Sequence, residues 1–343
     1  KKSWWENRSF IRTQITHDNE IRREFTLSPD GKSFAWQNFC GRLFFAGTNG
    51  VVRAKGPDSQ REGHYSWSPD GKYVVAQLNS VDSQREIAIV STTENAKYWL
   101  LTKNFEYDGW PTWSPDGQIV AWVSERAEIG ADNCYLCYVY LDNAVEEREK
   151  LYVKLNKARR EMGGKDLPLE KTKRPIPFEK LIDHVRITRI AGDYPHFSGD
   201  SRTLAFRANG KLKSICLPNE MTPKVVSDKI GFICEWIKKD TKDAGKILWR
   251  VNNKPAQGNT VYDVKNYQTT DIADYQELAF RTTWGRMKNF YYDPNMHGID
   301  WDAVRTKYLA AARNAGSPSV FSRVIQMMLG ELDTSHVGWS STN

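Results

Sequence analysis

The sequence has no run of about 18 apolar residues, so no part of it is expected to cross a membrane as a helix. It carries no P-loop, no dinucleotide-binding glycine pattern and no His-Glu-x-x-His motif, and we expect neither a cofactor nor a catalytic metal. The first residues, Lys1 to Trp5, lead into no apolar stretch, and no signal peptide is recognised there. We therefore expect a cytoplasmic protein, or a periplasmic or secreted one if a signal peptide precedes Lys1.

Cysteine is scarce, with five residues in the chain, and an odd number argues against a complete disulfide framework. Cys134 and Cys137 have the spacing of a metal-binding pair, but the residues around them are typical of a strand. Side chains three apart on a strand point to opposite faces, which disfavours a shared ligand. We expect buried thiols on a strand, and no metal site.

Lysine and arginine outnumber the acidic residues, giving a net charge of +7. Part of this excess lies in residues 144–175, where Glu, Lys and Arg are frequent. A solvated basic segment accounts for such a charge without a nucleic acid, so neither nucleic acid nor a membrane is expected as a partner.

The clearest pattern is an internal repeat built around the turn sequence Ser-Pro-Asp-Gly. Full copies begin at Ser28, Ser68 and Ser114, and a degenerate copy begins at Ser198, so that successive copies lie 40, 46 and 84 residues apart. Proline sets one backbone angle of such a turn and glycine accepts positive φ at another, so each copy predicts a tight connection between two strands.

A repeat length of about 40–50 residues is that of one four-stranded β-propeller blade. Residues 1–270 have room for about five to seven such blades. The copies resemble the Ser-Pro-Asp-Gly blades of Tol-type, prolyl-oligopeptidase-type and tricorn-type propellers. Further strands within blades are expected at 42–46, 87–90, 138–140, 213–217, 247–251 and 260–264.

The longest spacing between copies contains a charged insertion at 144–175. From Val145 to Met162 opposite charges recur four residues apart among good helix formers, which predicts a protruding helix followed by a loop. A solvated insertion and an arm that docks a partner or gates substrate both fit this pattern. Residues 181–190 alternate as in a strand, with Asp183, His184, Arg186 and Arg189 facing outward or lying at the edge of a blade.

From about Asp271 the apolar period changes from two to about 3.6, which predicts three helices in residues 271–343. Asp271, Asp300 and Ser317 are the expected N-caps, with Pro318 in the first turn of the third helix. Asp293-Pro294 ends the first helix and Gly316 the second. The expected apolar faces are Phe280, Trp284, Met287 and Tyr291, then Trp301, Val304, Tyr308 and Ala311 or Ala312, then Val320, Phe321, Val324, Ile325, Met328 and Leu332.

Two stretches of this region, Phe280 to Trp301 and Val324 to His336, resemble the segment that opens the catalytic region of tricorn-type serine peptidases. That family is a branch of the carboxy-terminal-processing protease clan, and the resemblance covers residues 275–339. A propeller just before this segment agrees with it. The resemblance implies a mainly β fold, a β-propeller of four-stranded blades, followed by a small α-helical bundle that begins the peptidase region.

By this resemblance His336 is the general base and Ser335 the residue that orients it, in a Ser-His-Ser-Glu tetrad. Neighbouring side chains rarely form a nucleophile–base pair, which fits a nucleophile other than Ser335. In the family the nucleophile, the oxyanion hole and the acidic residue follow this motif, so the chain is expected to lack them. His297 follows a turn, and a structural role is expected for it.

The expected function is therefore part of a tricorn-type serine peptidase that hydrolyses peptides, with the propeller gating or channelling substrate. A homo-oligomer is implied by the same resemblance. The alternative is a non-catalytic propeller module that binds a protein or peptide partner. A prolyl-oligopeptidase-type enzyme is disfavoured, because no Gly-x-Ser-x-Gly sequence follows the repeats.

Overall fold

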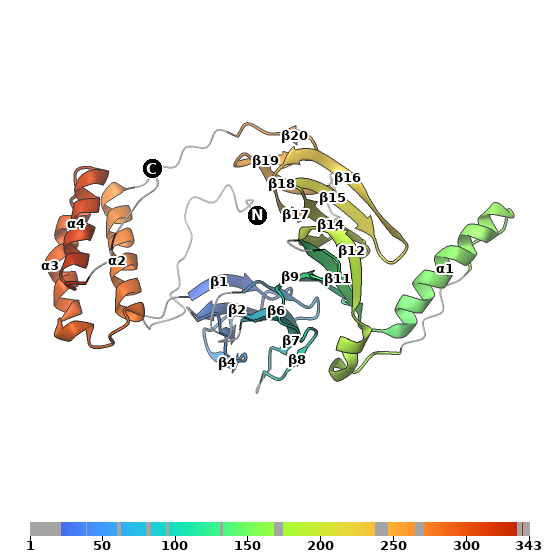
Figure 1. Ribbon diagram of the computed structural model, residues 1–343, viewed down its shortest axis with the longest axis horizontal. Coiled ribbons are helices and arrows are strands. Elements are labelled where there is room, and N and C mark those ends of the chain that lie inside the picture. Colours follow the sequence, from blue (N-terminus) through green and yellow to red (C-terminus); the bar gives the residue numbers. More distant parts are fainter. Residues whose placement is uncertain are drawn as a thin grey trace, which may run out of the picture. The chain divides into compact units, whose positions relative to one another are not determined.

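The computed structural model divides the chain into two compact units, Lys1–Val264 and Lys265–Asn343 (Figure 1). Each unit is described by itself. The structure describes residues 22–38, 40–59, 63–79, 84–93, 96–130, 133–167, 174–236, 246–264, 271–334 and 338, without the side chains of 233–235.

The first unit consists, in its described residues, of five antiparallel sheets of four strands each, and every sheet is a meander in chain order. This confirms a mainly β fold of four-stranded blades. The strands of the first and second sheets are β1 (Arg22–Leu27), β2 (Ser33–Asn38), β3 (Leu43–Gly47), β4 (Val52–Lys55), β5 (Tyr65–Trp67), β6 (Tyr73–Asn79), β7 (Arg85–Ser91) and β8 (Tyr98–Leu100). Those of the third, fourth and fifth sheets are β9 (Asp108–Trp113), β10 (Ile119–Glu125), β11 (Cys134–Tyr140), β12 (Arg186–Ala191), β13 (Asp193–Phe197), β14 (Thr203–Ala208), β15 (Lys211–Cys216), β16 (Glu220–Ile230), β17 (Phe232–Trp236), β18 (Ile247–Val251), β19 (Lys254–Gln257) and β20 (Thr260–Val261).

Successive sheets stack face to face, as blades of a propeller do. Strand β9 contacts β5 and β13, and β13 contacts β17, so neighbouring sheets meet at their first strands. The buried clusters lie between sheets: Val75 and Trp122 belong to one that joins the second and third, Tyr138 and Phe206 to one that joins the third and fourth. The central strands β10 and β11 therefore bury side chains on both faces.

Each strand expected within a blade lies inside an observed strand or extends beyond it by no more than two residues. The exception is 260–264, where only Thr260–Val261 is a strand. Cys134 and Cys137 lie on β11 as expected, the first half-buried and the second buried. They pack into different clusters on the two faces of the sheet.

The repeated turn has the same hydrogen bonds in all four copies. The hydroxyl of the turn serine donates to the aspartate two residues later, at 2.6 Å for Ser28, 2.6 Å for Ser68, 2.7 Å for Ser114 and 2.5 Å for Ser198. In the full copies the glycine has a φ of 69° to 74°, the left-handed region in which it costs least. In the degenerate copy Ser201 occupies that position with a φ of 64°.

Removing one turn hydroxyl should measurably destabilise the β unit. Ser114 is buried, and its Oγ also accepts the Ile119 N–H at 2.8 Å, so Ser114→Ala leaves buried polar groups unpaired. We expect the free energy of unfolding to fall by about 1–3 kcal/mol in urea denaturation. Ser91→Ala, whose hydroxyl contacts Thr93 at the surface, is the control and should change it by less than about 0.5 kcal/mol. Equal effects would contradict a structural role for the turn.

The first strands of three sheets contain a bulge that the sequence analysis did not predict. In β1, β9 and β13 two residues stand opposite one residue of the neighbouring strand. The first bulge residue lies four before the turn serine and has positive φ: Glu24 at 50°, Trp110 at 49° and Tyr194 at 50°. Left-handed backbone is costly for such residues, so the surrounding sheets must hold it in place.

The charged insertion forms helix α1 (Asn143–Glu161), which lies between β11 and β12 and accounts for the longest spacing between repeat copies. Its N-cap, Asp142, accepts the Ala144 N–H at 2.8 Å. An isolated bridge pairs Asp142 with Pro175, so the insertion leaves and rejoins the blade at one point. Buried residues are concentrated in the first turn of α1, and the rest of the helix extends away from the sheets (Figure 1).

The expectation of a strand over 181–190 is wrong at its start. Residues Phe178–His184 form a 3-10 helix, η2, and the strand begins at Arg186. Leu181 is fully buried, and the Phe178 ring packs against those of Tyr73 and Trp99, each at 4.9 Å. Packing against the second sheet thus overrides the alternation in the sequence.

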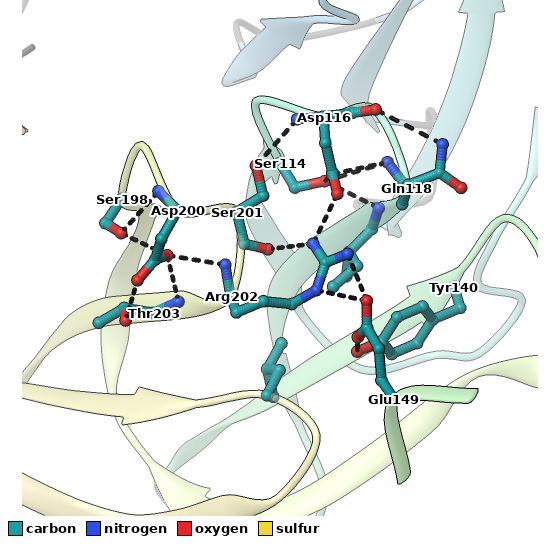
Figure 2. Close-up of polar contacts among 12 residues, drawn as sticks. Ser114, Asp116, Gln118, Tyr140, Glu149, Ser198, Asp200, Ser201, Arg202 and Thr203 are labelled. Atoms are coloured by element: carbon teal, nitrogen blue, oxygen red, sulfur yellow. Dashed lines mark hydrogen bonds and ion pairs between the residues drawn. The ribbon is translucent and has the colours of Figure 1, made fainter. Parts of the chain in front are cut away.

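Arg202 connects α1 to the turns of the third and fourth sheets (Figure 2). Its Nη1 is 2.7 Å from Asp116 Oδ2, and its Nε and Nη2 are 2.8 Å and 2.5 Å from Glu149 Oε1 on α1. Tyr140 donates to the other Glu149 oxygen at 2.8 Å. These contacts fix the base of α1 on the blades.

Asp108, at the start of β9, is fully buried, and the Asn104 amide donates to its Oδ2 at 2.9 Å. Burial raises the pKa of Asp108 from an ordinary value of 3.8 to about 6, although neighbouring hydrogen bonds from Ser124, Asn104 and Thr102 favour the charged form. The folded state therefore holds this proton more tightly than the unfolded state, and Asp108 costs stability as the pH rises from about 4 to 6.

Asp108→Asn should remove that cost. We expect the variant to gain stability over the native protein progressively between about pH 4 and 6.5, by up to about 3 kcal/mol. Urea denaturation of both proteins across this range measures the difference, from which other titrating groups cancel. A difference independent of pH would contradict the raised pKa.

The second unit is a small bundle of α2 (Ile272–Phe290), α3 (Trp301–Arg313) and α4 (Pro318–Gly330), with a short 3-10 segment, η3 (Met296–Gly298), after α2. The expected N-caps are confirmed, since Asp271, Asp300 and Ser317 each accept a backbone N–H of the first turn. In the described part of the chain, no helix is long and apolar enough to cross a membrane.

The bundle has one buried cluster, to which all three helices contribute. The expected apolar faces are largely confirmed, but Val320 is 48% exposed. It lies in the first turn of α4, four residues before the buried Val324 and on the same face of the helix, but it is not part of the buried cluster. The buried members of the cluster are Phe280, Met296, Trp301, Val304, Tyr308, Ala312, Ala315, Phe321, Val324, Ile325, Met328, Leu329 and Leu332.

Candidate active site

The two residues expected to carry catalysis, Ser335 and His336, lie outside the described residues. The described chain reaches Thr334, directly before them. The structure therefore shows the segment that leads to these residues. It consists of the end of α4 and residues 331–334 with their contacts.

Three contacts hold this segment to the bundle. Glu331, just after α4, accepts hydrogen bonds from the Tyr308 hydroxyl at 2.5 Å and the Lys307 ammonium at 2.7 Å. Leu332 is fully buried in the core. The Thr334 hydroxyl is 3.0 Å from the hydroxyl of Tyr291, the C-cap of α2. The chain is thus anchored at three of the four positions that precede Ser335.

Glu331 stays ionised in this arrangement. The Lys307 ammonium and then the Tyr308 hydroxyl lower the pKa of its carboxyl group. The hydrogen bond between the Tyr308 hydroxyl and the Glu331 carboxylate raises the pKa of Tyr308. Tyr308 therefore stays protonated and remains a donor. A protonated donor and an ionised acceptor make a strong hydrogen bond, which ties the end of α4 to α3.

Tyr291 belongs to a cluster of polar aromatic side chains after α2. The Tyr292 hydroxyl is 2.5 Å from His297 Nε2, and the Tyr291 hydroxyl is 3.4 Å from Nδ1. Asp293 accepts the backbone N–H of His297 at 2.9 Å, and the backbone N–H groups of Asn295 and then His297 lower the pKa of that carboxyl group. His297 itself has a φ of 53°. Both of its ring nitrogens thus face tyrosine hydroxyls.

The sequence analysis did not anticipate this cluster. It assigned Tyr291 to an apolar face and gave Thr334 no partner, because the two lie 43 residues apart. The Asp-Pro sequence after α2 marked a turn, but nothing in it indicated that the turn would bring His297 back onto Tyr291 and Tyr292.

Comparisons with known proteins find a family match in the helical unit. The family model described as the tricorn protease C1 domain matches residues 274–330, which are α2 to the end of α4. A curated relative, "Putative tricorn protease homolog 2" of Streptomyces coelicolor, is 43% identical over 158 residues, which is 46% of this chain and 10% of that protein. Residues 274–330 thus resemble the tricorn protease C1 domain.

The fold of the chain also has a counterpart among solved structures. The crystal structure of the tricorn protease superposes with a TM-score of 0.69 over 92% of this chain and 33% of that chain, at 11% identity. A putative TolB from Agrobacterium tumefaciens gives a TM-score of 0.43 at 14% identity, over 72% of this chain and 82% of that one. The chain thus spans a tenth of the curated relative and a third of the tricorn protease chain.

The matched C1 segment ends at 330, four residues before the last of the continuous described residues. In the described residues, no three His, Cys, Asp or Glu side chains gather in a way that could hold a metal ion. The roles of Ser335 and His336 stay predictions.

The anchoring of residues 331–334 leads to a stability prediction. Leu332→Ala removes a fully buried side chain, and we expect the free energy of unfolding of the helical unit to fall by about 2–5 kcal/mol. Val320→Ala is the matched control: this exposed residue sits in a helix, where alanine is favoured, and the change should be below about 0.7 kcal/mol. Urea denaturation followed by the helical circular dichroism signal separates the two. A harmless Leu332→Ala would show that this segment is not anchored through its core.

Proposed function

We propose that this chain is part of a tricorn-type serine peptidase that hydrolyses peptides, with His336 as the general base. The observation that carries the proposal is the C1 match, which covers α2 to α4 and ends shortly before Thr334. The hydrogen bond from Thr334 to Tyr291 supports it, because a catalytic base must be held on a rigid support.

In the proposed mechanism the His336 imidazole accepts the proton of a serine hydroxyl as that oxygen attacks the peptide carbonyl. It then donates the proton to the leaving amine. Ser335 accepts or donates a hydrogen bond that keeps the ring in the required tautomer. The motif assigns neither the nucleophile nor the acidic member of the tetrad to a residue of this chain.

The propeller is proposed to gate or channel peptides toward that region, and a homo-oligomer is proposed from the family resemblance alone. The four cysteines that the structure describes, Cys40, Cys134, Cys137 and Cys216, are free thiols. Free thiols are usual in reducing compartments, which supports the cytoplasm as the proposed location.

Replacement of His336 by alanine tests the proposal. In the complete polypeptide as its gene encodes it, we expect His336→Ala to lower kcat for a fluorogenic peptide by about 10³-fold or more with little change in KM, because only proton transfer is lost. His184→Ala, on η2 in the other unit, is the matched control and should leave both constants unchanged.

Ser335→Ala should lower kcat less than His336→Ala, since an orienting group is lost and the base remains. If His336→Ala hydrolyses peptides at the native rate, the peptidase role fails and the alternative, a propeller that binds a protein or peptide partner without catalysis, is favoured.

A further inference from the structure

A hollow of about 540 Å³ lies between the third and fourth sheets, at the ends of their strands away from the repeated turns. The edge strand β12 and the strands β13 to β15 line most of it. A second hollow, of about 510 Å³, follows β12 and shares Arg189 and Ile190 with the first. The two hollows adjoin at these residues of β12, and we call them together the groove.

The Trp110 ring lines the groove, and it belongs to a residue of a strand bulge. Trp110 and Tyr194 are the positive-φ residues of two neighbouring first strands, and their rings lie 4.3 Å apart. Tyr194 in turn contacts Phe232 of the next first strand at 5.9 Å. The bulge in β9 thus places the Trp110 ring in the groove, beside the ring of Tyr194.

The groove carries more positive charge than its own carboxylates neutralise. The Arg207 guanidinium is paired with Asp193, with Nε 2.8 Å from Oδ1 and Nη2 2.5 Å from Oδ2. Its Cζ lies over the rings of Tyr194 and Phe232, 4.7 Å and 4.5 Å from their centres. Arg189, which is exposed, and Lys213, which is half-buried, have no hydrogen bond or ion pair within the part of the chain that the structure describes. The side chains of Arg189 and Lys213 are therefore available to pair with an anionic ligand.

The thiol of Cys134 also lines the hollow, and it does not compete for those cations. Burial, and then the nearby carboxylates of Glu125, Asp193 and Asp108, raise the pKa of Cys134 to about 11. The thiol is neutral at physiological pH, so the groove contains one carboxylate, already paired, and two unpaired cations.

We propose that this groove binds an acidic peptide segment, whose carboxylates pair with Arg189 and Lys213 while neighbouring side chains pack on the Trp110 ring. A groove made of two adjoining hollows suits an extended chain better than a single inorganic anion. The Trp110 ring offers a contact that a phosphate cannot use. The proposal concerns association, and it does not depend on the proposed peptidase activity.

Fluorescence anisotropy with the full chain tests it. The probe is a short fluorescein-labelled peptide of alternating Glu and Ala with a C-terminal amide, and the comparison peptide has Gln in place of Glu. We expect the Glu peptide to bind at least about tenfold more tightly and to weaken as salt rises. Equal affinity of the two peptides would overturn the proposal.

The variant R189Q/K213Q should lose about tenfold or more in affinity for the Glu peptide. The matched control, R53Q/K180Q, removes the same charge from two exposed side chains outside the groove and should bind as the native chain does. Equal losses in both variants would show general charge attraction and overturn the site. If the double variant is misfolded by circular dichroism, R189Q alone, at an exposed residue, carries the same comparison with R53Q.

Competition identifies the group that is recognised. An Ala peptide with a free C-terminal carboxylate that displaces the probe would show that a terminal carboxylate is accepted too, which keeps the carboxylate chemistry. Displacement by inorganic phosphate or by a DNA duplex as effective as that by the unlabelled Glu peptide would overturn the preference for an acidic peptide.

Discussion

The fold of the larger unit depends on the hydrogen bond between the serine and the aspartate of each repeated turn. In the three full copies the serine Oγ also accepts a backbone N–H across the turn, and in the degenerate copy Asp200 accepts that of Thr203. These bonds fix where the second strand begins and therefore its register on the first. Register decides which side chains face each neighbouring sheet. Because the sheets share buried clusters face to face, an error in one turn would reach two cores.

The repeat made the architecture readable from sequence, since the turn residues recur and each has a local reason to be there. The helix caps at Asp271, Asp300 and Ser317 were predictable on the same ground. Two of the local errors, at 181–184 and Val320, have a common cause: periodicity indicates that one face is buried, but the neighbouring element decides which residues it covers. The 3-10 turn of η2 exists because Phe178 and Leu181 have the second sheet to pack against.

Features that join distant residues were not predictable. The bulges at Glu24, Trp110 and Tyr194 carry no glycine that would have marked them, and they are visible only in the strand pairing. Arg202 meets Glu149 across 53 residues, and Thr334 meets Tyr291 across 43. Likewise Arg189 was expected on an outward-facing strand, but its nearness to Lys213 depends on how two sheets stack. For Ser335 and His336 the sequence supplies a family motif, and the structure supplies the segment that leads to it.

The bridge between Asp142 and Pro175 gives the α1 insertion a particular independence. The two ends of the insertion meet at this bridge, so the residues between them form a closed loop on the blade. The length of that loop does not set the path of β11 or β12. Such a position tolerates lengthening, shortening or replacement, with the ion pairs Arg202–Glu149 and Arg186–Glu146 as local contacts to be lost. Homologous blades could therefore differ here by a whole helix and still share one scaffold, and the same junction offers a natural point for grafting a reporter or a second domain.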